Sequence, residues 1–261
     1  MIRRFKKAFR WLGVIIGAII VIVLLALGVL TTPGPFFPEE KQYRSITVHS
    51  EIPIGREMDS IMQEVFERLD AVPIYDPHRK FNLCLCSTQD KFTFFARLKH
   101  GPNRIMGFNV WGNCYVNGDL LKELTVRTGG KPKYMARGGS IVHIATHELM
   151  HGYLSDACGI VASRILPEWK AEGYCEYGVN QAVAPRDIGY TIPERIDIFL
   201  DDRQWNPTAS THRGHYVWGL MMEYLINVKG MNLEQVMDDS VTQDAVYQEM
   251  MDWRKFLRNS N

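Results

Sequence analysis

The sequence predicts an α+β domain with a small mixed sheet, preceded by one transmembrane helix. Three observations lead to this class. Residues 11–30 form an uncharged apolar run, short strand-like segments occur between residues 44 and 116, and apolar residues recur at helical spacing from residue 141 onward. We therefore expect a cleft between a sheet and a mainly helical C-terminal half.

The N-terminus predicts a membrane anchor and its orientation. Residues 1–10 form a basic tail that carries Arg3, Arg4, Lys6, Lys7 and Arg10. Residues 11–30, as a helix, span about 30 Å, the thickness of a bilayer core. A signal-peptide core is usually shorter, which favours an uncleaved anchor, although Ala26-Leu27-Gly28 is a possible cleavage site. The basic tail predicts a cytoplasmic N-terminus and a single-pass protein whose domain is periplasmic or extracellular.

Residues 31–43 are expected to form a stiff, extended linker, because Pro33, Pro35 and Pro38 punctuate them. Residues 44–261 are long enough for one domain with a substantial core. Outside the basic tail, 25 Lys and Arg stand against 29 Asp and Glu, a net charge of −4, which argues against a nucleic-acid partner. The only Asn-x-Ser/Thr site is blocked by Pro207, which favours a bacterial envelope protein. The oligomeric state is left open.

Within the domain, the element boundaries follow from periodicity. Residues 56–72 predict an amphipathic helix with Ile61, Val65 and Leu69 on one side. Strands are expected at 80–86, 92–98 and 105–116, and a further strand is expected to begin within 44–49. Later helices are expected from residue 141, from Pro167, over 220–228 and over 245–257. Residues 187–210 form an insertion rich in Asp, Arg and Pro whose role is open.

The most informative motif is His147-Glu148-Leu149-Met150-His151, inside the helix expected after the possible N-cap Ser140. In a helix, His147 and His151 lie one turn apart on the same face, so two ring nitrogens can bind one metal ion. Glu148 beside them can reach a metal-bound water, which predicts a catalytic site with one Zn²⁺ per chain. His143 extends the row, but the helix rises about 12 Å from His143 to His151, so one ion cannot bind both and only one adjacent pair can be ligands. Glu148 favours His147 with His151, and His143 is expected to be a packed or hydrogen-bonded side chain.

A third ligand is expected at Glu172, in Trp169-Lys170-Ala171-Glu172-Gly173. With the histidine motif, this segment resembles the gluzincin metallopeptidases, whose second motif often reads W-x-x-E-G, and among them the small peptidase MA-like domains. The resemblance is strong over residues 138–178 and loose elsewhere. It implies a zincin-like metallopeptidase fold, with the sheet packed over the motif helix and Glu172 as zinc ligand; the alternative is a solvated helix carboxylate.

The resemblance implies further roles. Glu176, one turn after Glu172, would accept the N–H of a ligand histidine, unless it is an ordinary surface glutamate; Glu168 is expected in solvent. Tyr216 or its rival His215 would stabilise the oxyanion, with His212 a weaker candidate, unless Tyr216 simply packs in the core and the histidines are solvated. Residues 107–116 would supply the edge strand that binds substrate backbone, or else an ordinary core strand.

The cysteines are Cys84, Cys86, Cys114, Cys158 and Cys175, so at least one thiol is free or intermolecular. Cys158 and Cys175 flank the hairpin that carries Glu172, and a disulfide between them would hold Glu172 near the histidines. The alternative is two small buried residues.

Together these residues predict a membrane-anchored zinc metallopeptidase that hydrolyses peptide bonds, with Glu148 as general base and a peptide or protein as substrate. Two alternatives stay open: a zinc hydrolase of a non-peptide amide, and a catalytically silent zincin-fold binding or assembly protein of the cell envelope.

Overall fold

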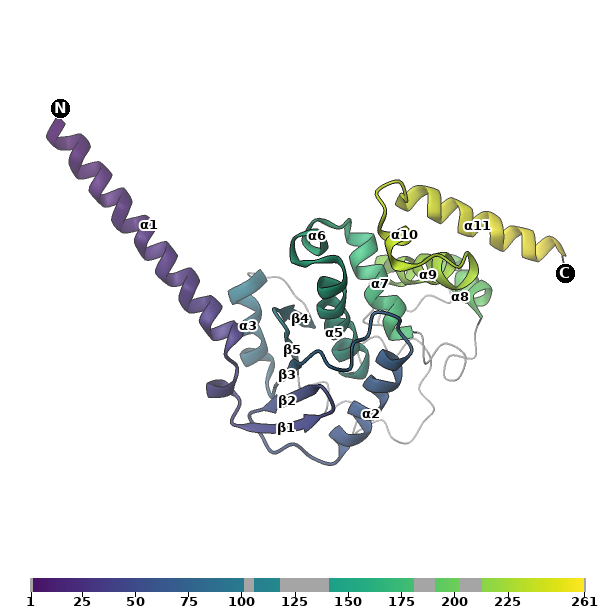
Figure 1. Cartoon of the computed structure of the whole chain (residues 1–261), viewed down its shortest axis with the longest axis horizontal. Helices are drawn as coiled ribbons and strands as arrows, with labels where there is room; N and C mark the ends of the chain where they lie inside the picture. The colour runs from purple at the N-terminus through teal and green to yellow at the C-terminus, as the bar shows by residue number, and fades with distance from the viewer. Residues whose placement is uncertain (1, 101–105, 118–140, 181–190, 202–212, 261) are drawn as a thin grey trace.

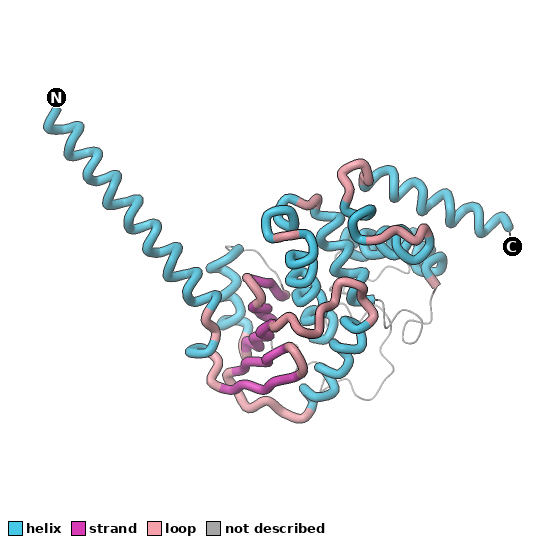
Figure 2. Tube along the Cα trace, viewed as in Figure 1, coloured by secondary structure: helices cyan, strands magenta, loops and turns pink. Residues whose placement is uncertain are grey.

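The computed structural model describes residues 2–100, 106–117, 141–180, 191–201 and 213–260 (Figure 1). The long helix α1 (Ile2–Thr31) projects from a domain in which strands lie on one side and most helices on the other (Figure 2). Residues Trp11–Thr31 have a mean hydropathy of 3.2 and are long and apolar enough to cross a membrane. The predicted apolar helix is thus present, and its insertion in a membrane stays a prediction.

In the described part of the chain, five strands form one mixed sheet in the order β1-β2-β3-β5-β4. Their bounds are β1 (Glu39–Tyr43), β2 (Ile46–Ser50), β3 (Phe81–Cys86), β4 (Gly107–Val110) and β5 (Asn113–Asn117). The central strands β2, β3 and β5 are parallel, while β1 and β4 are antiparallel edges. The strand expected at 80–86 is confirmed. The strand expected at 105–116 is a hairpin that turns at Trp111 and Gly112, where both φ angles are positive.

The expected linker 31–43 is partly wrong. It contains a 3₁₀ turn (Gly34–Phe36) and the whole of β1, which pairs with β2 from Glu39↔Ser50 to Tyr43↔Ile46. Phe37 is buried against the rings of Phe95 and Tyr115. Burial of this aromatic side chain attaches the segment to the domain, and no proline pattern could reveal that.

Residues 92–98, expected as a strand, lie in helix α3 (Gln89–His100). Phe92, Phe95 and Ala96 are buried at helical spacing, while Phe94 is exposed. Each buried phenylalanine contributes about 1.5–3 kcal/mol, more than the roughly 1 kcal/mol span of strand propensities. The hydroxyl of Thr88 also accepts the N–H of Lys91 at 3.2 Å at the start of the helix. Packing on the sheet therefore outweighs the local preference of the phenylalanines for a strand.

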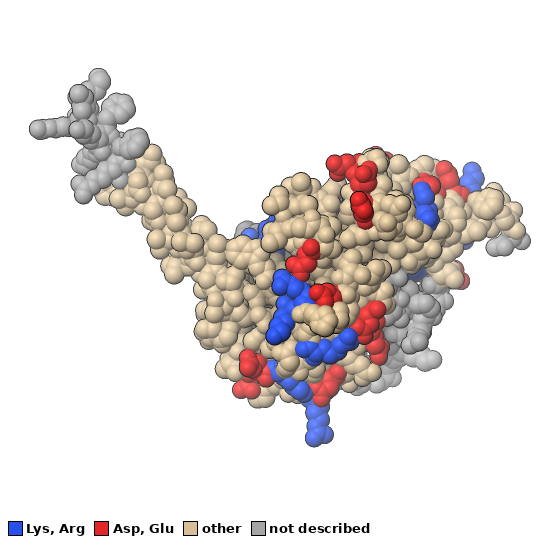
Figure 3. Space-filling view, in the orientation of Figure 1, with Lys and Arg blue, Asp and Glu red and all other residues tan. Residues whose placement is uncertain are grey.

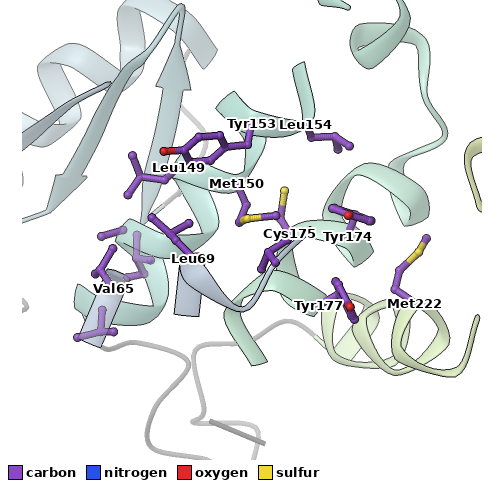
Figure 4. Packing of buried hydrophobic residues seen from close by; sticks show 14 of the residues in the cluster. Val65, Leu69, Leu149, Met150, Tyr153, Leu154, Tyr174, Cys175, Tyr177 and Met222 are labelled. Atoms are coloured by element: carbon purple, nitrogen blue, oxygen red, sulfur yellow. The ribbon is translucent and has the colours of Figure 1, made fainter. Parts of the chain in front are cut away.

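The other side of the sheet is covered by α5 (Ile141–Cys158), which packs between α2 (Glu57–Asp70) and α7 (Glu168–Asn180). Figure 4 shows this layer, with Leu149, Met150 and Tyr153 of α5 among Val65 and Leu69 of α2 and Tyr174 and Cys175 of α7. The helices expected at 56–72, after 141 and after Pro167 are confirmed. Ser140, the expected N-cap of α5, lies outside the described residues.

The remaining helices are α6 (Ile160–Ile165), α8 (Ile192–Leu200), α9 (Arg213–Glu223), α10 (Leu233–Met237) and α11 (Gln243–Ser260), and α9 continues into a π-helical turn (Tyr224–Val228). The helices expected at 220–228 and 245–257 correspond to α9 with its π-helical turn and to α11. The described part of the insertion 187–210 holds α8. The buried side chain of Arg195 on α8 donates to Glu223 on α9 at 2.8 Å, which joins the two helices.

Candidate metal centre

The hairpin of α5 and α7 brings together the three predicted ligands. Nε2 of His147 lies 3.0 Å from Oε2 of Glu172, and Nε2 of His151 lies 3.5 Å from the same oxygen. Two atoms bound to one tetrahedral zinc at 2.0–2.1 Å are about 3.3 Å apart. Two imidazoles and a carboxylate at these separations are a donor set that fits zinc.

Glu148 is the next residue on α5 and lines the same cleft. Its side chain is buried, and burial raises its pKa. The edge strand β4 passes directly over it: a Cβ on Gly107 would lie 2.7 Å from Cγ of Glu148. The side-chain amide of Asn109 also donates to the backbone oxygen of Glu148 at 3.3 Å. The carboxylate is therefore held between α5 and β4 with a pKa shifted towards neutrality, as a general base requires.

Glu176 is buried beside His147 rather than exposed. Its Oε1 lies 3.2 Å from Nδ1 of His147 and 3.2 Å from Nε2 of His143. Burial alone would raise the pKa of Glu176, but the two histidines outweigh it and lower that pKa well below its usual range. The expected contact between Glu176 and a ligand histidine is thus present. His143 is hydrogen-bonded to Glu176 and lines the edge of the cleft.

The electrostatics of His147 favour a cation at this point. Burial lowers the pKa of His147, but the carboxylates of Glu172 and Glu176 outweigh burial and raise that pKa well above its usual range. The pKa of Glu172 is lowered by the two histidines, again against the effect of burial. Two carboxylates thus converge on one buried imidazole. A positive charge held between them, a proton or a metal ion, compensates their burial.

Cys175 is a close neighbour that sequence reasoning assigned elsewhere. Its Sγ and one ring nitrogen each of His147 and His151 all lie within 4.8 Å of one another. All five cysteines are free thiols, so the predicted Cys158–Cys175 disulfide is absent from the structure. Cys175 follows Glu172 by three residues on α7, a spacing that puts both side chains on one face and could have indicated this position. Glu172 places one oxygen 3.0 and 3.5 Å from the ring nitrogens of His147 and His151, so Glu172 stays the candidate ligand.

Of the two residues predicted for the oxyanion, only His215 lines the cleft. Its Nδ1 lies 3.9 Å from Oε2 of Glu172, and its ring is parallel to that of His147, with centroids 6.1 Å apart. Tyr216 is buried on another face of α9, where its hydroxyl donates to the backbone oxygen of Arg195 at 3.3 Å. Tyr216 follows His215 on α9 and points about 100° away from it, into the core and not into the cleft. The prediction for Tyr216 is wrong, and His212 lies outside the described residues.

The cleft around these residues has a volume of about 1040 Å³. Met106, Gly107, Phe108 and Asn109 line its β4 side, and Ile160, Arg164 and Leu166 line it from α6 and the turn that follows. Glu168 lies at the rim and is exposed, as expected. The space therefore extends from the metal centre along the edge strand.

Comparisons of this chain with models of protein families, with curated proteins and with solved structures found no match.

Proposed function

We propose that this protein is a zinc-dependent metallopeptidase of the gluzincin type that hydrolyses peptide bonds. One observation carries the proposal: Nε2 of His147 and Nε2 of His151 lie 3.0 and 3.5 Å from the same oxygen of Glu172, while Glu148 lines the same cleft. Local helix spacing accounts for the two histidines, but Glu172 comes from another helix. Such convergence with an adjacent buried base matches a hydrolytic site.

His147, His151 and Glu172 would hold the zinc ion. When bound, zinc supplies Lewis acidity, which polarises a carbonyl and lowers the pKa of water. Glu148 takes the proton of the attacking water and passes it to the leaving amine. Burial of Glu148 supports this role. It raises the pKa of the carboxyl towards neutrality, which suits a group that first accepts a proton and later donates it.

Two further side chains orient the reaction. When His147 is neutral, its Nδ1–H donates a hydrogen bond to Glu176, which directs Nε2 at the metal and increases the donor strength of Nε2. His215 faces the same centre from α9 and is placed to donate a hydrogen bond to a developing oxyanion.

The edge strand supports a peptide rather than a small amide as substrate. The strand order gives β4 one strand partner, β5, among the described strands, and residues of β4 line the cleft beside Glu148. An extended peptide can add to such an edge through backbone hydrogen bonds, with its scissile bond over the metal centre. Because α1 would anchor the domain outside the cytoplasm, the substrate would be a peptide or protein of that compartment.

The test uses the full chain purified in detergent, with its zinc content and its cleavage of a peptide library measured. We expect about one zinc per chain, and Glu148→Gln should retain zinc while hydrolysis falls by several orders of magnitude. Glu168→Gln, an exposed glutamate at the same cleft, is the matched control and should remain active. Zinc-loaded wild type without cleavage of any peptide would favour the non-peptide hydrolase or the silent binding protein. Failure to retain zinc at all would overturn the metal centre.

A further inference from the structure

The C-terminal end of α1 is part of the domain. Leu30 is buried in a cluster with Phe37, Phe95 and Tyr115. Its backbone oxygen accepts a hydrogen bond from the hydroxyl of Tyr115 at 2.9 Å and from the amide of Asn113 at 3.3 Å. If α1 crosses a membrane, this end lies at the outer headgroup boundary. The domain is then held against the bilayer in one orientation, without a loose tether.

Large apolar side chains are exposed on α6, on α3, which contacts α1, and in the β4–β5 turn. We define the apolar surface as α6 with Phe94 of α3 and Trp111 of the β4–β5 turn. None of the six residues of α6 is buried, and Ile160, Val161 and Ile165 are 58%, 77% and 78% exposed. In Figure 1, α3 lies beside the end of α1 and α6 lies on the upper side of the domain, whereas the C-terminus of α11 points away. Large aliphatic side chains at such exposure indicate a partner in this region.

The chemistry of this surface matches a membrane interface. In Figure 3, the surface between α1 and α6 is mostly uncharged, whereas charged side chains gather below it and further from α1. Trp111 is a residue type enriched at the level of lipid headgroups. Arg164, between the exposed side chains of α6, is exposed and can reach lipid phosphates. The combination of aliphatic side chains, a tryptophan and an arginine is typical of interfacial segments.

We propose that this surface rests on the outer leaflet of the bilayer that α1 crosses. Trp111 and Ile160 both line the cleft, so its mouth opens beside the lipid headgroups and admits chain segments close to the membrane. The inference rests on the proposed membrane anchor, and for the substrate position on the proposed hydrolase. Lipid docking itself requires no zinc and no catalysis.

The experiment places the full chain in phosphatidylcholine nanodiscs and attaches an environment-sensitive fluorophore at Ile160→Cys or Ile165→Cys. The background is Cys158→Ser, since Cys158 is half-buried and the other four cysteines are buried. Phe256→Cys on α11 is the control, because Phe256 is 66% exposed and the C-terminal end of α11 lies far from α1 in Figure 1. Circular dichroism and thermal unfolding verify that each variant folds.

We expect lipids that carry a nitroxide to quench the labels on α6 several-fold more strongly than the label at residue 256. Iodide in the aqueous phase should show the opposite order. Equal quenching by lipid at all three positions, or free access of iodide to α6, would overturn the proposal. Strong lipid quenching of α6 in a protein that cleaves no peptide would leave the docking surface in place and remove only the hydrolase.

Discussion

Oε1 of Glu176 lies 3.2 Å from Nδ1 of His147, while Glu172 contacts the other nitrogen of the same ring. Two carboxylates from one helix thus orient one imidazole from its neighbour. Glu176→Gln should weaken zinc affinity by about tenfold, because outer partners of ligand histidines typically contribute 10–100-fold. Chelator competition measures this, with Glu168→Gln as control. An unchanged affinity would show that Glu176 only fills space.

Glu172→Ala should lower zinc affinity by at least about tenfold, because it removes a ligand. Cys175→Ser should leave affinity close to wild type, although the thiol lies within 4.8 Å of a nitrogen of each ligand histidine. Isothermal titration of the metal-free protein compares the two variants. If Cys175→Ser lost zinc while Glu172→Ala retained it, Cys175 would be the third ligand and Glu172 would not.

His215→Gln should lower kcat by about 10²–10³-fold if His215 stabilises the oxyanion, with little change in zinc content. Tyr216→Phe should leave kcat near wild type. It should instead lower the free energy of unfolding by about 0.5–1.5 kcal/mol, because the hydrogen bond to the backbone oxygen of Arg195 is lost. Steady-state kinetics and denaturant unfolding separate the two effects, and the reverse pattern would reinstate Tyr216.

Gly107→Ala should lower both stability and activity. The added Cβ would lie 2.7 Å from Cγ of Glu148 and from Cγ2 of Ile144, so β4 must shift away from α5 at a cost of about 1–3 kcal/mol. Gly34→Ala is the control, since an added Cβ at Gly34 has no atom within 4 Å. Chemical denaturation and peptide cleavage measure the pair. Equal effects would show that β4 tolerates displacement.

In the metal-free protein, the ion pairs of His147 with Glu172 and Glu176 should stabilise the fold fully between about pH 4.5 and pH 6.5. These limits are the ordinary pKa values of Glu and His. His147 has a raised pKa, so its contribution is complete below pH 6.5 and is lost as pH rises through the folded-state pKa. Glu172 and Glu176 have lowered pKa values, so their contributions are present above pH 4.5 and are lost as pH falls.

His147→Gln should flatten this pH dependence of the metal-free protein in thermal unfolding. In zinc-loaded wild type the alkaline loss should disappear, because a bound cation then replaces the proton between the carboxylates. A pH profile of the metal-free protein that His147→Gln leaves unchanged would contradict the assignment.

The sequence by itself determined the features that depend on neighbours along the chain. The four-residue spacing of His147 and His151 places both on one face of any helix, and the periodicity around them predicts that helix. Pro167 and the segment after it likewise predict α7, with Glu172 and Glu176 one turn apart. The apolar run at residues 11–30 predicts α1 from length and composition alone.

Only the tertiary structure decided which of these side chains meet across elements. The rotation of α9 about its axis turns His215 into the cleft and Tyr216 into the core, and no local pattern specifies that rotation. The packing of α7 on α5 places Cys175 beside the histidines instead of in a disulfide. Phe92 and Phe95 form a helix because the sheet and the end of α1 bury them there. These outcomes depend on contacts between residues far apart in the chain, and periodicity in sequence carries no information about such contacts.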